Sequence, residues 1–483
     1  MAIRRALLFS FAQRGYGVLL QLVTTVILAR LLGPAETGVF ALAVALALLG
    51  QLLRDFGVAE YIIAQSDVTL QKKRAAFTLT LLIALAISAV LLGVSGPLAR
   101  LYGEPGVKSV LQVLSINFVL LPFGSVGFAM MSKELRFEQL FWIQSLAATL
   151  GTGLTLFLAF HGFSYMSMAW GSLASTSVVV TTMMLLRGRS FFLCPTFHGL
   201  KDVLAFGGVL TGARLLEQAA FRSQDLIVSG FLGFHAGGIL SKTNSLVGSF
   251  NDVFNSAVVR VAVPVFAQSL GNLEAIRSQY VKATTLVFTA QWLFFPALGI
   301  FAKEIVAILL GPAWADCVPL LQICAAASLA WAPYMLSVPL LTALGSVRDL
   351  LRIQVVSAPL LVLSFLVGAQ FSLLWVVVLC SIVVPVRLYM IDRSLYRNCG
   401  IRFGETARFL LPSIKLAGIV AVIAIAVRHG LIWLGLPASA VLLVGAAAAI
   451  GSALVAANAM GHPLLHELNR IFPLIRTPPE ARR

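Results

Sequence analysis

Charged and polar side chains recur at helical spacing inside segments of this sequence that are otherwise apolar. In the segment 203–231, one such set falls within about 60° on a helix of 100° per residue: Arg214, Gln218, Phe221 and Asp225, with Glu217 and Arg222 beside it. A charged side chain at the centre of a bilayer costs roughly 2.5–3.5 kcal/mol, so each needs a cavity or a partner. These residue types in this pattern predict either a binding surface for ionised groups or a set of internal ion pairs.

Three more segments carry such polar faces. Residues spaced three or four apart follow one side of the segment 237–265, namely Lys242, Ser245, Ser249, Asp252, Ser256 and Arg260. Shorter sets occur in the first two apolar segments, namely Arg14, Gln21 and Thr25, then Gln51, Arg54 and Asp55. We expect these four segments to line one polar space.

The alternative is that the charges hold helices together. Arg214 with Glu217, Arg222 with Asp225, and Arg54 with Asp55 are spaced to act as ion pairs or as charged neighbours. Lys242 and Arg260 lie near opposite ends of their segment, where their side chains could extend to lipid headgroups. The residue pattern leaves both interpretations open.

The composition requires a membrane as the solvent for these segments. Of the 483 residues 59% are hydrophobic and 11% charged, and the mean hydropathy is +0.95, whereas soluble domains carry about 25% charged residues. A bilayer core needs roughly 20 apolar residues per helix. We therefore expect an all-α integral membrane protein with about fourteen spans, near residues 10–30, 38–64, 76–98, 108–131, 140–160, 164–186, 203–231, 237–265, 282–302, 318–342, 352–369, 373–391, 411–428 and 438–459.

The basic residues predict the orientation of these spans. The net charge is +16, which in a soluble protein would suggest nucleic acid, but cytoplasmic loops of membrane proteins are enriched in Lys and Arg. With the N-terminus placed inside, most of the 35 Lys and Arg fall in inner loops and tails. This alternation predicts cytoplasmic N- and C-termini, and it predicts no nucleic-acid partner.

Two pairs of similar segments indicate a duplicated unit. The segment "ARLLGPAETGVFALAV" begins at Ala29, and "SGFLGFHAGGILSKTN" repeats its Leu-Gly and its later Gly at an offset of 200, with Phe234 at the position of Pro34. Likewise "LYGEPGVKSVLQVLSINFVLLP" from Leu101 resembles "LLGPAWADCVPLLQICAAASLAWAP" from Leu309. We therefore expect a six-helix lobe at 1–197, a parallel six-helix lobe at 198–400, and two additional spans with a cytoplasmic tail at 401–483.

No motif for a catalytic or metal site is found. The sequence contains no G-x-x-x-x-G-K-[ST], no G-x-S-x-G and no H-E-x-x-H. His462 and His466, with Glu467, have the i, i+4 spacing of metal ligands on a helix, but Pro463 lies between them. We therefore expect a solvated tail there. The sequence thus predicts no catalytic residue, no metal and no cofactor.

The segment "ILARLLGPAETGVFALAVALALLGQLLRDFGVAEYIIAQ", from Ile27 to Gln65, resembles the opening of bacterial polysaccharide flippases, which carry R-x-L-G-P-x-x-x-G followed by D-x-G. "SQDLIVSGFLG" and "GPAWADCVPLLQI" are similar to two later segments of that family. The family belongs to the multidrug/oligosaccharidyl-lipid/polysaccharide exporter superfamily. The resemblance implies two six-helix lobes in a V around a central cavity, as in multidrug exporters.

The resemblance also implies a function and a cellular location. Its members move polyprenyl-pyrophosphate-linked oligosaccharides across the bacterial inner membrane for O-antigen, capsule or exopolysaccharide synthesis. Arginine can bind a pyrophosphate by bidentate hydrogen bonds, so the candidate substrate-binding residues are Arg14, Arg54, Arg214, Arg222, Lys242 and Arg260. The candidate ion-coupling residues, for H⁺ or Na⁺, are Asp55, Glu217, Asp225 and Asp252. Expected partners are the lipid-linked substrate, the membrane, and a polysaccharide polymerase with its chain-length machinery.

Two other function classes compete with this one. A drug exporter or a peptidoglycan-precursor flippase has the same architecture, and a drug exporter would favour acidic over basic cavity residues. A membrane polysaccharide polymerase or ligase needs an active site on the outer face, usually in a large loop. The longest predicted outer loop, near Phe301 to Asp316, has about sixteen residues, which disfavours the enzyme.

Overall fold

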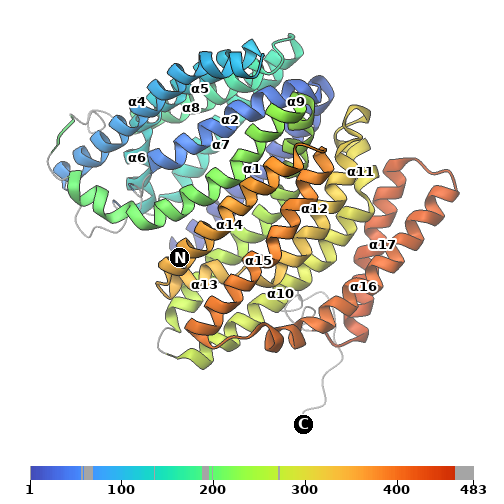
Figure 1. Cartoon of the computed structure of the whole chain (residues 1–483). Coiled ribbons are helices and arrows are strands. Elements are labelled where there is room, and N and C mark those ends of the chain that lie inside the picture. The colour runs from blue at the N-terminus through green and yellow to red at the C-terminus, as the bar shows by residue number, and fades with distance from the viewer. Residues whose placement is uncertain are drawn as a thin grey trace. The chain divides into compact units, whose positions relative to one another are not determined.

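The computed structural model describes residues 2–55, 58, 62, 69–134, 136–187, 195–197, 200–269 and 272–462. Within the helices, the side chains of residues 2–12, 14, 52, 55, 187, 200–214, 250, 252–265, 267–268, 347, 403 and 405 lie outside this description. The described residues form helices joined by turns, and no strand occurs among them (Figure 1). The predicted all-α class is confirmed.

The helices of the first half follow the predicted spans closely. They are α1 (Ala2–Leu31), α2 (Pro34–Asp55), α4 (Leu70–Leu101), α5 (Pro105–Leu120), α6 (Pro122–Lys133), α7 (Phe137–Phe160), α8 (Met166–Arg187) and α9 (Leu200–Gln268). In α9 only Gly233 has non-helical angles, with φ 84° and ψ 169°. Two predicted spans therefore meet at a single residue instead of a loop.

The second half of the chain also consists of helices joined by short turns. Its helices are α10 (Leu273–Ile300), α11 (Ala302–Leu309), η2 (Pro312–Trp314), α12 (Cys317–Trp331), η3 (Ala332–Tyr334), α13 (Ser337–Ala343), α14 (Val347–Gly368), α15 (Leu373–Cys399), α16 (Phe403–Trp433) and α17 (Ala438–Ala459). Local sequence explains several starts: the side chain of Thr69 accepts a hydrogen bond from the N–H of Lys72, and that of Asn272 from Ala275. Such caps satisfy backbone donors that the first turn leaves unpaired.

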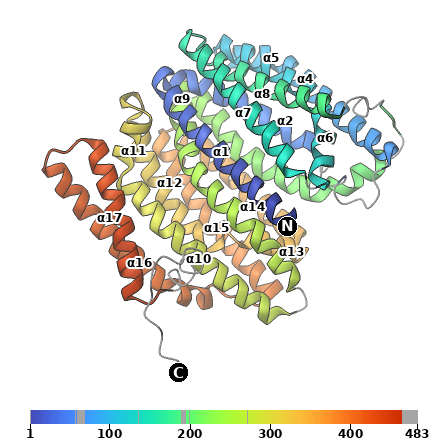
Figure 2. The ribbon, with the colours of Figure 1, turned by 180° about the vertical axis from the view of Figure 1, so that it is seen from behind.

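The chain divides into two compact units, which we describe separately. Unit 1 comprises Met1–Lys242, Leu309–Ala313 and Gln354–Val376, and unit 2 comprises Thr243–Ile308, Trp314–Ile353 and Val377–Arg483. In unit 1, α7 packs on both α1 and α8, and α5 packs on α2 and α4 (Figure 2). In unit 2, α16 packs on α10 and α17. The predicted lobes 1–197 and 198–400 and the extension 401–483 remain a prediction.

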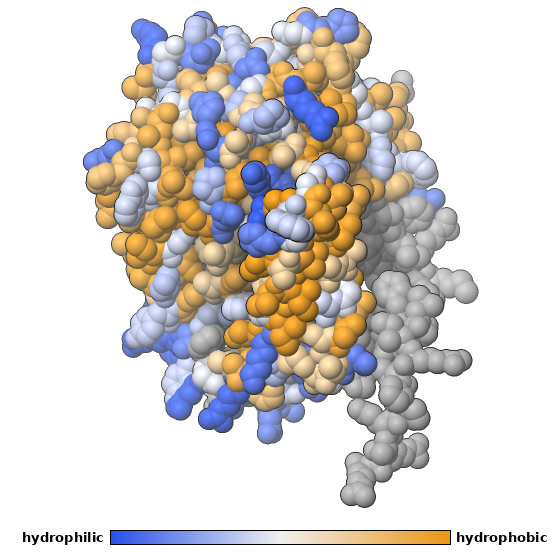
Figure 3. Space-filling model, turned by 90° about the vertical axis from the view of Figure 1, so that its right-hand side faces the viewer, coloured by the Kyte–Doolittle hydropathy of each residue, from blue (hydrophilic) through white to orange (hydrophobic). Residues whose placement is uncertain are grey.

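Ten helices in the described residues are long and apolar enough to cross a membrane, and the bent pair α5 and α6 would make an eleventh. The face drawn in Figure 3 carries broad areas of hydrophobic residues. Exposed apolar side chains on that scale need lipid around them. The protein is therefore a multi-pass membrane protein, while fourteen spans remain a prediction.

Breaks in the helices occur at equivalent positions of the two similar segments. Gly33 lies between α1 and α2, and Gly233 interrupts α9. In the second pair, Gly103 and Gly311 both have a positive φ, 65° and 93°, which glycine adopts without steric cost. The glycines predicted to correspond thus both stand at helix breaks, and a positive φ is shared by Gly103, Gly233 and Gly311 but not by Gly33.

Side-chain contacts also join loops that the charge pattern puts on one side of the membrane. Ser164 donates a hydrogen bond of 2.6 Å to Glu36, which joins the first and fifth connections. In unit 2, Arg428 lies 2.8 Å from Glu304, which joins two predicted outer connections. Each pair unites segments of the same predicted side, as the alternation requires.

Candidate functional site

The best-defined part of the candidate site lies on α9, just before its break at Gly233. Nη1 of Arg222 is 3.9 Å from Oδ2 of Asp225, one helical turn away. The guanidinium also lies 5.8 Å from the ring centroid of Phe221, within the range of a cation–π contact. The structure thus shows the pairing of Arg222 with Asp225, which is one of the two interpretations that the residue pattern left open.

Burial makes this pair chemically distinctive. Asp225 is only 7% exposed, and its neighbours Gln224 and Ser229 are also buried, whereas the Arg222 side chain is 32% exposed. Opposite charges attract more strongly in an apolar environment than in water, but removing a carboxylate from water is costly. The pair therefore keeps a negative charge inside the protein and leaves its positive partner partly accessible to an anionic ligand.

The remaining predicted site residues fall into two groups. Arg54, in the last turn of α2, is buried, while Glu217 and Lys242 on α9 are partly exposed. Each of these three makes at least one further interaction. Five side chains lie outside the described residues, and their contribution stays a prediction: Arg14, Asp55, Arg214, Asp252 and Arg260.

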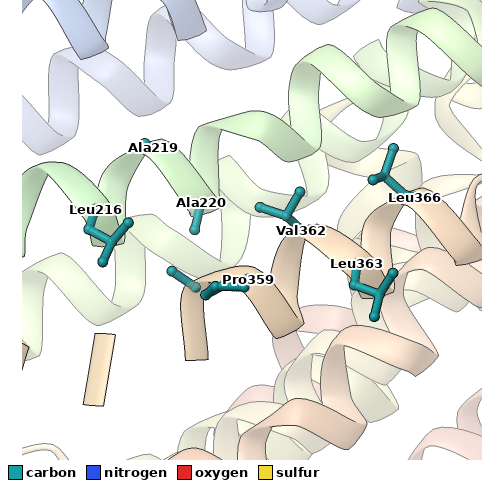
Figure 4. A pocket seen from close by; sticks show the side chains of 8 residues that line it. Leu216, Ala219, Ala220, Pro359, Val362, Leu363 and Leu366 are labelled. Carbon is teal, nitrogen blue, oxygen red and sulfur yellow. The ribbon is translucent and has the colours of Figure 1, made fainter. Parts of the chain in front are cut away.

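An apolar pocket borders the same helix. Leu216, Ala219 and Ala220 of α9 line it together with Pro359 and Leu363 of α14, and its volume is about 400 Å³ (Figure 4). The other lining residues are also apolar: Ala358, Val362 and Leu366. One segment of α9 thus borders an apolar pocket and carries an ion pair within two turns.

The two similar glycine segments touch each other. A Cβ added at Gly38 would lie 2.0 Å from the carbonyl oxygen of Phe234, and one added at Gly238 would lie 1.8 Å from that of Pro34. These two contacts are related by the same offset of 200 residues, so the start of α2 and the part of α9 after its break meet through equivalent residues. The sequence similarity indicated the repeat but gave no signal that its two copies are in contact.

Tyr102 is a contact residue that the sequence pattern did not reveal. Its hydroxyl donates a 3.0 Å hydrogen bond to the carbonyl oxygen of Leu226, and its ring centroid lies 6.1 Å from that of Phe234. It thereby joins the end of α4 to α9 on both sides of Gly233. At the equivalent position of the second similar segment stands Leu310, which has no polar group, so the spacing alone could not identify the tyrosine.

The expectation of a solvated tail is wrong for His462. This side chain is 2% exposed, and its Nε2 is 3.0 Å from the hydroxyl of Ser413. The Ser413 hydroxyl in turn lies 2.7 Å from that of Thr289. The short turn after α17 brings the imidazole back onto α16 and α10, a long-range packing that hydropathy cannot show. His466 and Glu467 lie outside the described residues.

Comparison with known proteins finds relatives that are named for polysaccharide biosynthesis. It is 28% identical over 335 residues to the succinoglycan biosynthesis transport protein ExoT of Rhizobium meliloti (strain 1021), covering 68% of this chain and 66% of the relative. It is 24% identical over 317 residues to the lipopolysaccharide biosynthesis protein WzxC of Escherichia coli (strain K12), covering 63% and 62%. The matched part therefore spans just under two-thirds of each relative's length.

Solved structures share the fold. The lipid II flippase MurJ in its inward closed conformation matches with a TM-score of 0.75 at 10% identity, over 95% of this chain and all of the other. A multidrug resistance MATE family transporter in its inward-facing conformation matches with a TM-score of 0.57 at 15% identity, over 79% and 95%. The family described as polysaccharide biosynthesis protein matches residues 27–319, more than half of the sequence. The chain belongs to that polysaccharide biosynthesis protein family.

Proposed function

We propose that this protein is a flippase that moves polyprenyl-pyrophosphate-linked oligosaccharides from the cytoplasmic to the periplasmic leaflet of a bacterial inner membrane. The product would serve surface polysaccharide synthesis. The observation that carries the proposal is the family match over residues 27–319, which includes α2 and the α9 segment with the Arg222–Asp225 ion pair. The names of the relatives, one a succinoglycan transport protein and one a lipopolysaccharide biosynthesis protein, support the same substrate class.

The chemistry of α9 suits a substrate with a charged head and an apolar chain. The Arg222 side chain is 32% exposed, and its Nε is buried and, among the described residues, has no hydrogen-bond partner. Guanidinium groups bind phosphate oxygens through paired N–H donors. The carboxylate of Asp225 holds Arg222 in place and keeps the net charge of the pair near zero, so that an anionic headgroup can be released after transport.

In the proposed cycle, two six-helix lobes, 1–197 and 198–400, take up the headgroup from the cytoplasmic side while the lipid chain stays in the bilayer. The lobes then open toward the periplasm. N- and C-termini are cytoplasmic in this scheme, in line with the distribution of basic residues. A polysaccharide polymerase with its chain-length machinery would receive the product.

We propose an ion gradient as the energy source, with Asp225 or Glu217 taking up H⁺ or Na⁺. Asp225 is the better supported of the two because it is buried beside Arg222, so that neutralising it would release the guanidinium. Replacing Asp225→Asn should reduce transport and flatten its dependence on pH. The conservative Asp225→Glu variant, which keeps the charge, should retain more activity. Full transport with an unchanged pH response in Asp225→Asn would exclude this residue.

The flippase assignment is tested by deleting the gene in its host and following the lipid-linked repeat unit. We expect loss of surface polysaccharide and accumulation of the repeat unit on the cytoplasmic leaflet, with recovery when the intact gene is returned. Accumulation on the periplasmic leaflet would point to a later step, such as polymerisation, and would contradict the proposal. Accumulation of peptidoglycan precursor instead would assign the protein to the other flippase class.

A further inference from the structure

A second, uncharged polar pocket lies in unit 1, where α1 packs against α7 (Figure 2). Its volume is about 290 Å³, near the lower end of the roughly 300–1,000 Å³ typical of small-ligand pockets. Its polar lining residues are Gln21, Thr24 and Thr25 from α1 and Thr152 from α7, and the other lining residues are Gly17, Leu20 and Ala148. No lining residue is ionisable, which separates this pocket from the charged face of α9.

Polar side chains of the same two helices pair with each other below the pocket. Nε2 of Gln13 donates to Oε1 of Gln144, and the hydroxyls of Tyr16 and Thr149 are 2.6 Å apart. These contacts hold the facing helices together one to two turns before Gln21. The pocket therefore begins where these polar contacts between α1 and α7 end.

Within the pocket, the described polar side chains of α1 are not hydrogen-bonded to that of α7. The hydroxyl of Thr24 donates to the carbonyl oxygen of Leu20 on its own helix and keeps only acceptor capacity. Among the described residues, the side chains of Gln21, Thr25 and Thr152 have no hydrogen-bond partner. Gln21 is exposed, and Thr25 and Thr152 are partly exposed, so their unpaired polar groups are accessible to a ligand or to water with matching hydrogen-bonding groups.

The donor and acceptor inventory selects the ligand class. A threonine hydroxyl and a glutamine amide can each both donate and accept, as sugar hydroxyls can. A phosphate would need cations or several N–H donors, and a hydrocarbon chain would leave the side chains of Gln21, Thr25 and Thr152 without hydrogen-bond partners. The volume suits one sugar ring better than a whole repeat unit.

We propose that the α1–α7 pocket binds one uncharged sugar residue of the lipid-linked oligosaccharide. This inference rests on the proposed flippase function and adds a carbohydrate subsite to it. The pocket contributes sugar selectivity, while the basic residues serve the pyrophosphate.

Binding of two probes to the purified full-length protein in nanodiscs tests the subsite. The probes are undecaprenyl pyrophosphate alone and the same lipid carrying one galactose or glucose, compared in competition by native mass spectrometry. Wild-type protein should prefer the hexose-bearing lipid about tenfold, the effect expected of two hydrogen bonds. A Thr25→Val, Thr152→Val variant, which removes both hydroxyls with little change of shape, should lose this preference and bind the bare lipid as before.

Two control variants keep the result interpretable. Thr181→Val makes the same substitution at an exposed position of α8 and should keep the preference. Gln21→Met, a single change of similar length, should reduce the preference even if the double variant does not fold. A wild-type protein that binds neither lipid would refute the flippase function itself. Equal binding of both lipids by the wild type, or an undiminished preference in the pocket variants, would overturn the sugar subsite alone and assign the pocket to water.

Discussion

Replacing Gly38 or Gly238 by alanine should force apart the two similar segments at the start of α2 and after the break in α9. The added Cβ would lie 2.0 Å from the Phe234 carbonyl oxygen in the first variant and 1.8 Å from the Pro34 carbonyl oxygen in the second. Ordinary contact begins near 3.4 Å. Because both obstacles are backbone atoms, no side-chain rotation can relieve the overlap, and the helices must shift.

The expected magnitude follows from two opposing effects. Overpacking of a tight contact costs about 1–3 kcal/mol, while alanine gains about 1 kcal/mol over glycine within a helix. Gly93→Ala on α4 is the matched control, since no described atom lies within 4 Å of its Cβ position and it should show only the gain. The difference between control and test variants is therefore about 1–3 kcal/mol, roughly 2–6 °C in melting temperature at about 2 °C per kcal/mol.

The assay is thermal unfolding of the purified variants in one detergent, followed by intrinsic fluorescence. Because both substitutions separate the same pair of segments, the double variant should lose less than the sum of the two single losses. If Gly38→Ala and Gly238→Ala melt at or above the temperature of Gly93→Ala, the helices do not meet at these glycines. Fully additive losses would instead indicate two independent contacts.

Three further substitutions probe other contacts, each by thermal unfolding against the wild type. Glu304→Ala leaves Arg428, whose side chain is 20% exposed, without its carboxylate partner and should cost about 1.5–3 kcal/mol, the range for a hydrogen bond to a charged group. A second change, Arg428→Leu, should restore most of this loss, and no recovery would refute the pairing. Burial lowers the pKa of His462 below its ordinary value. As the pH falls, the unfolded state therefore takes up a proton at this histidine before the folded state does, and the stability of the fold should decrease below about pH 6.5. A His462→Gln variant should lose less stability between pH 7.5 and 5.5, and an identical pH profile would contradict this. Tyr102→Phe removes the bond to Leu226 and should cost about 0.5–1.5 kcal/mol, whereas no change would show that the ring alone makes the contact.

Much of the fold could be predicted because membrane helices are specified locally. A run of apolar residues must satisfy its backbone hydrogen bonds within the run, so hydropathy gives the position of a helix without knowledge of its neighbours. Glycine and proline mark the breaks for an equally local reason, as at Gly33, Gly103 and Gly311. The relation between Gly33 and Gly233 was likewise visible, because a duplication leaves similar residues at a constant offset.

The candidate site was less predictable because it depends on which helix faces which. Helical spacing put Phe221 and Asp225 on one face, yet Phe221 is 45% exposed while Asp225 is buried. Spacing also allowed both a cavity and an ion pair for Arg222, and only the packed structure shows the pair. For Tyr102 the sequence offered no signal, since its role comes from a helix more than a hundred residues away.

The sequence by itself determined that this chain is helical, lies in a membrane, carries charges within its spans and contains a repeated segment. Each of these follows from composition, hydropathy or spacing, which are properties of neighbouring residues. The tertiary structure decided that the two glycine segments touch, that Asp225 is buried beside Arg222, that His462 packs onto α16, and that α1 and α7 form an open pocket with uncharged polar side chains. These depend on contacts between distant segments, which are fixed by the shapes and small residues of the packed helices.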